Sequence, residues 1–363
     1  MSKRVLVLWA DETSSNLGVR ALSQGALSLA RQAWGDDTEV DFQSFEFGPL
    51  GTQLSGKVVL KGTLTGNRDL RKRMAAYDAV IDTGAGDSFT DIYGLKRMAI
   101  MFYTRHVAQA AGVPVILSPQ TVGPFNSAFG RLAARRTLKR AETVFVRDSI
   151  SMDYARQLGF EPDCLSTDVV FALPQPESTG SKRADVALNV SGLLWSTDDH
   201  GSKIRYQELT RDIIGKLMDA GRSITLLPHV VDNPSLDNDI TAVKELLSEF
   251  GNRLEVFVPT GLEEVRAFVS DCQVVVGARM HACLNALSVG TPAIPLAYSR
   301  KFAPLLADIG WEHTIDLKEE HVAERVVKLL DLPGLESEAV RVREKAEHRL
   351  QQAVDHLGKR TLP

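Results

Sequence analysis

Three consecutive residues, Arg279, Met280 and His281, carry the strongest chemical signal in the sequence. They stand between a predicted buried strand at residues 273–277 and a predicted helix at residues 282–289. Backbone N–H groups and the dipole at a helix start favour an anion, and a guanidinium can hold a phosphate or carboxylate with two hydrogen bonds. An imidazole can exchange a proton near neutral pH. The segment therefore predicts an anion site with its own proton donor. The structural alternative is a capped helix with a surface arginine and a hydrogen-bonded histidine.

Further cations and a second histidine follow other predicted strands. Arg147 comes directly after the apolar run at residues 143–146, with Asp148 or its neighbour placed to cap the next helix, so it predicts a second anion clamp. His229 and Lys301 also follow predicted strands and are candidates for the same donor site. The structural alternatives are an ion pair between Arg147 and Asp148, a histidine held by hydrogen bonds, and a solvated lysine.

Three polar side chains are candidates for binding a sugar. Asn16 opens the first predicted helix, Asp87 follows a glycine-rich turn, and Gln120 ends a strand before a Gly-Pro turn. Glycines after a strand let the backbone approach a ligand closely, and Asp87 can act as a base on a sugar hydroxyl. Asp87 can equally cap a helix, and the turn after Gln120 can be purely structural.

Short β-branched apolar runs alternate with amphipathic helical patterns along the chain. Such strands, separated by helices, are typical of a parallel sheet covered on both faces. We therefore predict an α/β fold of two facing Rossmann-like, doubly wound domains, with ligands in the cleft beyond the carboxyl ends of the strands. The predicted parts are an acceptor-side domain (1–173), a Pro- and Gly-rich linker (174–185), a donor-side domain (186–335) and a helix (336–363) that packs back on the first domain.

The bulk composition excludes some classes of protein. The 363 residues include 42 Lys and Arg and 46 Asp and Glu, and the net charge of −4 disfavours a dedicated nucleic-acid binder. Three distant cysteines and a short apolar start predict a cytoplasmic protein without a signal peptide or membrane span. The histidine spacing predicts no metal site.

Two segments are harder to interpret from sequence. Residues 48–67 are glycine-rich, and we predict a mobile loop there.

A predicted helix near residues 131–140 has a basic face. This face can be simply solvated, or it can meet an anionic or membrane-bound acceptor. Its members are Arg131, Arg135, Arg136, Lys139 and Arg140.

The order of these motifs resembles the polysaccharide pyruvyl transferases. Arg279-Met-His281 is followed by Ala-Leu-Ser-Val-Gly-Thr-Pro at residues 286–292 and by Lys301-Phe302, and it is preceded by Arg147-Asp-Ser and by Gln120. The resemblance implies a fold similar to the GT-B glycosyltransferases. It also implies transfer of pyruvate from phosphoenolpyruvate to sugar hydroxyls, often as a cyclic ketal, with phosphoenolpyruvate as co-substrate and no further cofactor.

The resemblance also implies roles for single residues. Arg147, Arg279 and His281 would be the donor-binding and catalytic set, and Met280, His229 and Lys301 complete the expected donor site. Two positions depart from the family pattern on the expected acceptor side, because Val19 follows Gly18 and Ala85 stands where a glycine is common.

His281 is the candidate acid that protonates the donor's methylene carbon, and Asp87 or His229 is the candidate base for the acceptor. The expected partner is a saccharide, free or lipid-linked. Association with the inner membrane surface and assembly into a homo-oligomer are both compatible with the sequence.

One rival function is that of a nucleotide-sugar glycosyltransferase of the same architecture, which would lack its usual ribose-binding Glu because Asn285 stands there. The other is a sugar- or anion-binding relative without catalysis.

Overall fold

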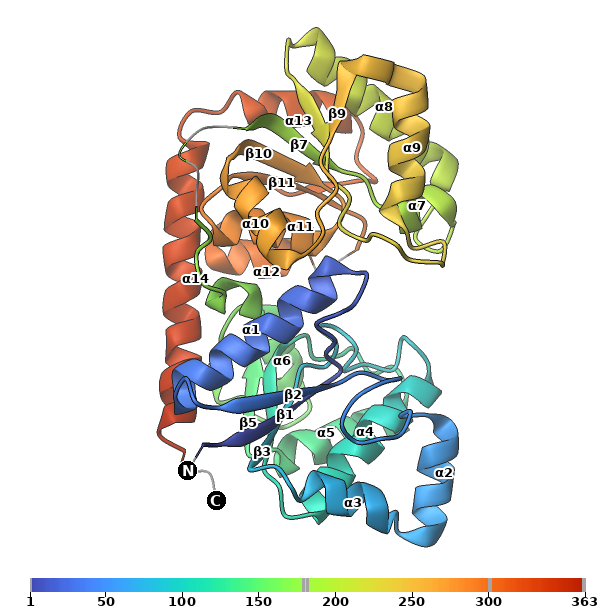
Figure 1. Cartoon of the computed structure of the whole chain (residues 1–363), viewed down its shortest axis with the longest axis vertical. Coiled ribbons are helices and arrows are strands. Elements are labelled where there is room, and N and C mark those ends of the chain that lie inside the picture. Colours follow the sequence, from blue (N-terminus) through green and yellow to red (C-terminus); the bar gives the residue numbers. More distant parts are fainter. Residues whose placement is uncertain (1, 178–179, 181–182, 300–301, 361–363) are drawn as a thin grey trace. The chain divides into compact units, whose positions relative to one another are not determined.

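The short apolar runs form two parallel sheets of six strands each. The computed structural model describes residues 2–177, 180, 183–299 and 302–360. By its internal contacts the chain forms two units. The first comprises Met1–Glu12, Leu22–Leu173 and Ala346–Pro363, and the second comprises Thr13–Ala21 and Pro174–Lys345. Both units are doubly wound, which confirms the predicted fold class (Figure 1).

The sheet of the first unit has the strand order β2-β1-β3-β4-β5-β6. Its strands are β1 (Arg4–Leu8), β2 (Glu39–Gln43), β3 (Ala79–Asp82), β4 (Val115–Gln120), β5 (Thr143–Val146) and β6 (Cys164–Leu165). The helices around it are α1 (Leu17–Trp34), α2 (Gly56–Thr65), α3 (Arg68–Met74), α4 (Leu95–Ala110), α5 (Ala128–Arg140), α6 (Ser149–Gln157) and α14 (Leu335–Gly358). Helices α1 and α14 each contribute residues to both units.

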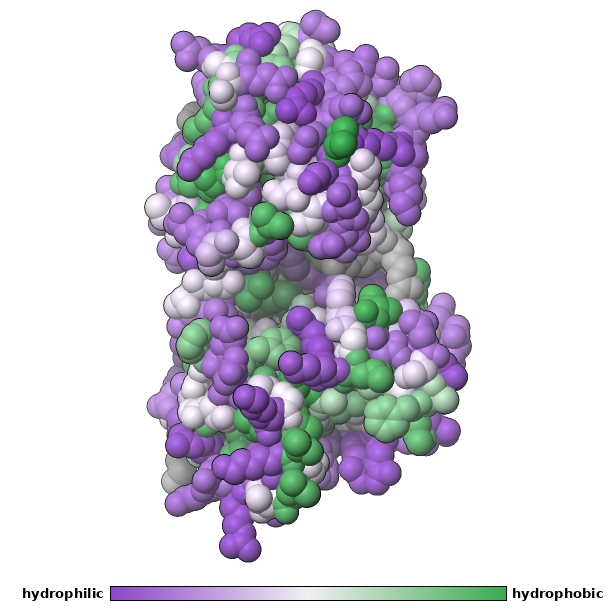
Figure 2. Space-filling view, turned by 90° about the vertical axis from the view of Figure 1, so that its right-hand side faces the viewer, coloured by the Kyte–Doolittle hydropathy of each residue, from purple (hydrophilic) through white to green (hydrophobic). Residues whose placement is uncertain are grey.

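The core of this unit lies on both faces of its sheet. Successive strand side chains point to opposite faces, so Leu6 and Leu8 join the cluster that α3 to α6 cover. On the opposite face the ring of Phe145 meets that of His356 in α14, with centroids 5.7 Å apart. Seen from the side of α2, the surface of the unit shows hydrophobic groups among hydrophilic ones (Figure 2).

The sheet of the second unit has the order β12-β11-β10-β7-β8-β9. Its strands are β7 (Ala184–Asn189), β8 (Ile224–Leu226), β9 (Leu254–Val256), β10 (Cys272–Gly277), β11 (Ala293–Ala297) and β12 (Ile315–Asp316). Its helices are α7 (Gly192–Ser196), α8 (Lys203–Asp219), α9 (Asp239–Phe250), α10 (Leu262–Ser270), α11 (Met280–Ser288), α12 (Phe302–Ile309) and α13 (Val322–Leu330). The helix predicted at residues 282–289 is observed as α11, and Gly290 follows it with a φ of 81°, a left-handed conformation that favours glycine.

The predicted mobile loop at residues 48–67 is wrong, because α2 occupies half of it. Val58 and Val59 pack against the core of the first unit, which gives this segment a helical apolar face. Gly62 is required for packing, since a Cβ there would lie 1.7 Å from the hydroxyl oxygen of Tyr103. Gly62, one of the glycines behind the loop prediction, therefore permits close packing of α2 against Tyr103 of α4.

The units differ from the predicted domains in three places. Thr13–Ala21, expected in the first domain, belongs to the second unit, because the Leu17 amide donates to the His229 carbonyl at 3.0 Å. Strand β7 starts inside the predicted linker, and the first residues of α14 belong to the second unit. In the described part of the chain, no helix is long and apolar enough to cross a membrane.

Candidate functional site

The loop between β10 and α11 positions Arg279, Met280 and His281. Strand β10 ends at Gly277, Arg279 is the residue before the helix, and Met280 is its first residue. The Arg279 amide donates to the side-chain oxygen of Asn189 at 2.9 Å, which ties this loop to the end of β7. Arg279 and Met280 are buried and His281 is half-buried. The predicted helix start at this triplet is therefore observed.

The guanidinium of Arg279 is paired with two carboxylates in this structure. Its Nη2 donates to Asp239 at 2.7 Å and also to Asp237. Burial lowers the pKa of Arg279, but the charges of Asp239 and Asp237 raise that pKa by more, so it lies above its usual value. The side chain of Asp239 is fully buried, whereas that of Asp237 is 32% exposed. Asp237 is therefore the more accessible of the two carboxylate partners.

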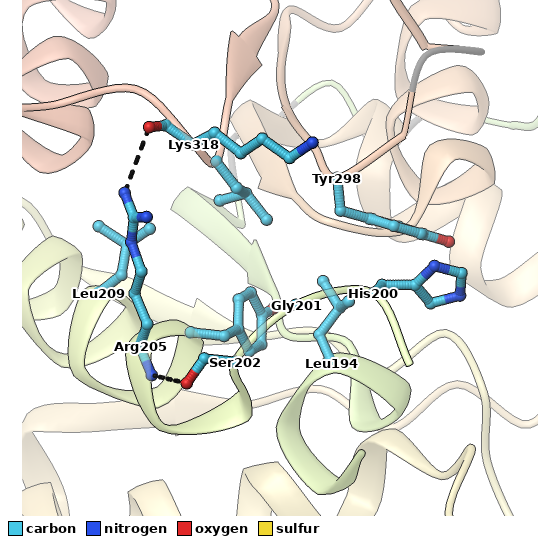
Figure 3. A pocket seen from close by; sticks show the side chains of 10 residues that line it. Leu194, His200, Gly201, Ser202, Arg205, Leu209, Tyr298 and Lys318 are labelled. Carbon is cyan, nitrogen blue, oxygen red and sulfur yellow. Dashed lines mark hydrogen bonds between the residues drawn. The ribbon is translucent and has the colours of Figure 1, made fainter. Parts of the chain in front are cut away.

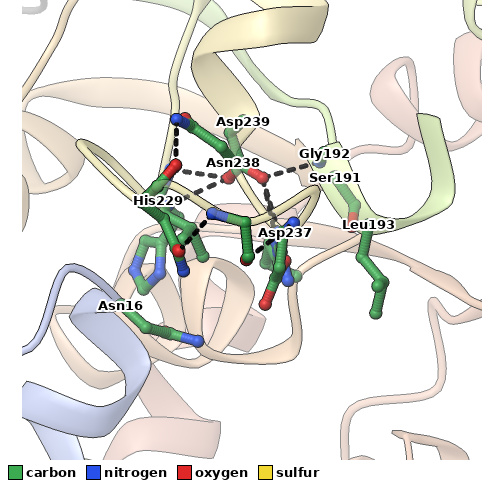
Figure 4. A network of polar contacts seen from close by, with 12 residues as sticks. Asn16, Ser191, Gly192, Leu193, His229, Asp237, Asn238 and Asp239 are labelled. Atoms are coloured by element: carbon green, nitrogen blue, oxygen red, sulfur yellow. Dashed lines mark hydrogen bonds and ion pairs between the residues drawn. The ribbon is translucent and has the colours of Figure 1, made fainter. Parts of the chain in front are cut away.

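Asp239, the first residue of α9, joins the ends of three strands (Figure 4). One carboxylate oxygen accepts from Arg279 and, at 2.7 Å, from the Gly192 amide. The other accepts from the amides of His229 and Val230 at 2.9 and 3.0 Å. Sequence reasoning missed Asp239 and Asp237. The available signal was the polar Asn-Pro-Ser-Leu-Asp-Asn-Asp segment at residues 233–239, which runs into a helix start.

His229 lies behind this network and is electrically neutral at pH 7. It is 1% exposed. Burial, aided by the charges of His281 and Arg279, lowers its pKa from 6.5 to about 3. Its Nε2 lies 3.1 Å from the amide nitrogen of Asn285. A neutral ring that accepts this hydrogen bond carries its proton on Nδ1.

The loop that opens α1 brings Asn16 to the same place. The amide oxygen of Asn16 accepts from the Gly18 N–H at 2.9 Å, and Figure 4 shows Asn16 beside His229. A Cβ on Gly18 would lie 3.0 Å from Nδ1 of His281, so the glycine permits a close approach. Asn16, His229, Arg279 and His281 are therefore grouped within the second unit.

Arg147 lies in the first unit, immediately after β5. It is 1% exposed, its Nη1 donates to Asp168 at 3.1 Å and its Nε donates to Thr121 at 2.9 Å. Among the described residues its Nη2 has no hydrogen-bond partner. Asp148 caps α6 as predicted, since it accepts from the Ser151 amide at 2.7 Å. Its carboxylate is 4.0 Å from Arg147, so Asp168 is the closer ion partner.

The two other acceptor candidates also lie in the first unit. Asp87 accepts a hydrogen bond from the Tyr93 hydroxyl at 2.7 Å and does not cap a helix. Gln120 is fully buried, and its amide nitrogen donates to the Asp82 carbonyl at 2.9 Å. A Cβ on Gly84 would lie 1.8 Å from its amide oxygen. Gln120 therefore supports the glycine-rich turn, and sugar binding by either residue stays a prediction.

Lys301, the last donor candidate, lies outside the described residues. The nearby Tyr298, which follows β11, lines a pocket of about 240 Å³ in the second unit (Figure 3). Its ring centroid is 5.0 Å from that of His200. Arg205 and Lys318 also line this pocket, and none of its described lining residues is a carboxylate. In the described residues there is no group of three or more His, Cys, Asp or Glu that could hold a metal.

Comparison with known proteins connects this geometry to a family. The model of the polysaccharide pyruvyl transferase family matches residues 16–300. The amylovoran biosynthesis protein AmsJ of Erwinia amylovora is 22% identical over 259 residues, which cover 66% of this chain and 61% of AmsJ. The matched region therefore spans less than two thirds of that relative.

Solved structures of low identity share the fold. A putative UDP-N-acetylglucosamine 2-epimerase from Listeria monocytogenes superposes with a TM-score of 0.63 and 11% identity, over 100% of this chain and 99% of its own. The glycosyltransferase SnogD from Streptomyces nogalater superposes with a TM-score of 0.52 and 14% identity, over 97% of this chain and 98% of its own. The expected likeness to the GT-B glycosyltransferase fold is thereby confirmed.

Proposed function

Because this chain belongs to the polysaccharide pyruvyl transferase family, we propose that it moves the pyruvyl group of phosphoenolpyruvate to a hydroxyl of a saccharide. The observation that carries the proposal is the grouping of Arg279 and His281 at the start of α11, beside a neutral His229. This arrangement supplies a cation, helix amides and a titratable imidazole in one place. These are the groups that an anionic enol donor requires.

The donor carries a phosphate and a carboxylate, so its site needs fixed positive charge. In the proposal Arg279 stays anchored to buried Asp239 and exchanges Asp237 for an oxygen of the donor. The amides at the start of α11 add a weaker attraction for the same anion. Arg147, in the first unit, is a separate candidate for binding an anion, because its buried Nη2 lacks a partner among the described residues and such donors are rare unless a ligand satisfies them.

The proposed reaction begins with proton transfer to the methylene carbon of the donor. This step leaves an oxocarbenium-like centre at the adjacent carbon. The oxygen of a sugar hydroxyl then forms a bond to that carbon, and its proton passes to a base. Cleavage of the carbon–oxygen bond to the phosphate releases phosphate with the bonding electron pair and leaves a second oxocarbenium-like centre. A second hydroxyl of the same sugar can attack that centre and lose its proton to a base, which closes a ketal.

His281 is the proposed general acid. Its neighbour His229 has a pKa of about 3 and is neutral at pH 7, which argues against His229 as the acid. General acid catalysis of this kind contributes about 10²–10⁴-fold to a rate. His229 is buried and hydrogen-bonded to Asn285, which favours a positioning role for it over that of a base.

The experiment measures phosphate release from phosphoenolpyruvate with a panel of saccharide acceptors. His281→Ala is expected to lower kcat by about 10²–10⁴-fold while its thermal unfolding stays like that of the wild type. Leu236→Ser, at an apolar residue that is 65% exposed in the same unit, is the control and should retain activity. Wild-type turnover in His281→Ala would remove this residue from the mechanism.

The pocket of Figure 3 is the proposed place for one sugar ring of the acceptor. A cavity of about 150 Å³ accommodates benzene, so a pocket of about 240 Å³ has room for a six-membered ring. The face of Tyr298 offers a flat apolar surface for sugar C–H groups, and Figure 3 shows the Lys318 amine directed across the pocket. Tyr298→Ala should raise the KM for the acceptor several-fold with little change in that for phosphoenolpyruvate. The reverse pattern would assign the pocket to the donor.

A further inference from the structure

Positive charge is concentrated in one stretch of the first unit. Residues 56–140 hold 14 Lys and Arg against 5 Asp and Glu, although the whole chain has a net charge of −4. Helix α5 contains five of these cations and no acidic residue. A local excess of this kind indicates an anionic partner.

The same helix exposes large apolar side chains. Phe129 and Leu132 are each 67% exposed, and Ile92 is 49% exposed. The Asp91 carboxylate accepts from the Ser127 amide at 2.9 Å, which fixes the segment next to Ile92 beside the start of α5. A helix face that contacts only water gains no stability from exposed large apolar side chains. Apolar and basic residues together on an exposed helix are typical of contact with a membrane interface.

A cavity of about 200 Å³ lies between α4 and α5. Arg105, His106, Arg136 and Arg140 line it, and none of the lining residues that the structure describes is acidic. Arg105 is 1% exposed, and its Nε and Nη2 bind the carboxylate of Asp82 at 2.6 and 2.9 Å. Its Nη1 has no hydrogen-bond partner within the described parts of the chain. The cavity therefore combines several cations with an unused buried donor, as an anion site requires.

Spacing along α5 connects the cavity with the exposed apolar residues. Phe129, Arg136 and Arg140 are at positions i, i+7 and i+11, so they share one side of the helix. We propose that α5 docks on an anionic lipid surface, with a headgroup phosphate in the α4–α5 cavity and with Phe129 and Leu132 in the interface. A nucleic acid would match the charge but offers no apolar layer for these two side chains. The inference does not depend on the donor of the transfer reaction.

The first test is sedimentation of the full chain with lipid vesicles. Vesicles of phosphatidylglycerol and phosphatidylcholine in equal amounts should carry the protein down, and vesicles of phosphatidylcholine alone should not. Added salt should weaken the binding because it screens the charges. Equal binding to both vesicle types, or a preference for a single-stranded oligonucleotide in competition with the anionic vesicles, would overturn the proposal.

Two pairs of variants with the same loss of charge locate the headgroup. Arg135→Gln/Lys139→Gln should weaken partitioning by about fivefold for each cation removed. Arg136→Gln/Arg140→Gln should weaken it more, because these two residues line the cavity. Phe129→Ser/Leu132→Ser should also reduce binding, whereas Lys244→Gln/Arg253→Gln in the second unit should not. Equal losses from the two α5 charge pairs would show that the cavity does not hold the headgroup.

Discussion

At the scale of single residues, Arg279 has two carboxylate partners of different exposure. Asp239 is fully buried and Asp237 is 32% exposed, so under the proposed function Asp237 is the one that competes with an incoming donor anion. Asp237→Asn should therefore lower the KM for phosphoenolpyruvate several-fold, measured by phosphate release. Asp331→Asn, which removes an exposed carboxylate elsewhere in the unit, should leave the KM unchanged. An increase in the KM of Asp237→Asn would mean that this carboxylate positions Arg279 for the ligand.

Asp239 should affect folding more than binding. Asp239→Asn removes the buried partner of a buried guanidinium and weakens the bonds to the amides of His229 and Gly192. Loss of one member of a buried ion pair costs about 3–5 kcal/mol in the free energy of unfolding. Urea denaturation of the variant measures this cost. A loss below about 1 kcal/mol would show that Asp239 is not the group that holds these strand ends together.

His229 predicts a pH dependence of stability. Its pKa is about 3 in the folded chain and 6.5 as the reference value, so below pH 6.5 the unfolded chain binds a proton that the folded chain does not. The free energy of unfolding should fall as the pH drops from about 6.5 toward 3, by at most about 1.4 kcal/mol per pH unit from this residue. Urea denaturation at several pH values should show a shallower slope for His229→Asn. An unchanged slope would contradict the neutral, buried state of His229.

Some of these residues could be predicted and others could not. Arg279, His281 and Arg147 were predictable because each follows an apolar strand at a helix start, a local pattern. Asp239 and Asp237 were not, since their importance comes from contacts with Arg279, about 40 positions away. The packing of Gln120 against the glycine-rich turn was unpredictable for a similar reason, because only the fold shows that Gly84 leaves room for the Gln120 amide.

At the scale of elements, two glycines inside helices have opposite surroundings. A Cβ on Gly25 of α1 would lie 2.5 Å from the Val169 carbonyl oxygen, whereas a Cβ on Gly215 of α8 would meet nothing within 4 Å. Gly25→Ala should destabilise the chain by about 1–3 kcal/mol through overpacking. Gly215→Ala should stabilise it by up to about 1 kcal/mol, because alanine favours a helix. Thermal unfolding of both variants tests this. A stabilised Gly25→Ala would contradict the close packing around α1, and a destabilised Gly215→Ala would contradict the open surroundings in α8.

Strands and long helices were predictable where their apolar pattern is strong. The apolar run at residues 143–146 coincides with β5, and the strand predicted at residues 273–277 differs from β10 by one residue. The short helix α2 was missed because its glycines and threonines lower its helix propensity. Its packing against the core supplies the missing stability.

At the scale of the whole molecule, the fold is similar to that of a putative UDP-N-acetylglucosamine 2-epimerase, whereas the proposed donor is phosphoenolpyruvate. Asn285 is fully buried and bonded to His229, so it is not presented to a ribose. Phosphoenolpyruvate at 100 times its dissociation constant should stabilise the folded chain by about 2.7 kcal/mol, and thus raise Tm by several degrees. UDP-N-acetylglucosamine at the same concentration should not. A larger shift with the nucleotide sugar would favour the glycosyltransferase alternative.

The assignment of Thr13–Ala21 to the second unit has a consequence for chimeric proteins. Suppose that residues 1–173 are exchanged for those of a relative. The exchange would also replace Thr13–Ala21, including Asn16 and Gly18, and so remove the native segment that pairs with the Val230 backbone. Graft boundaries should instead keep residues 13–21 with the recipient. Likewise, a fragment that begins at residue 174 should need a synthetic peptide that spans residues 13–21 to recover its native backbone pairing.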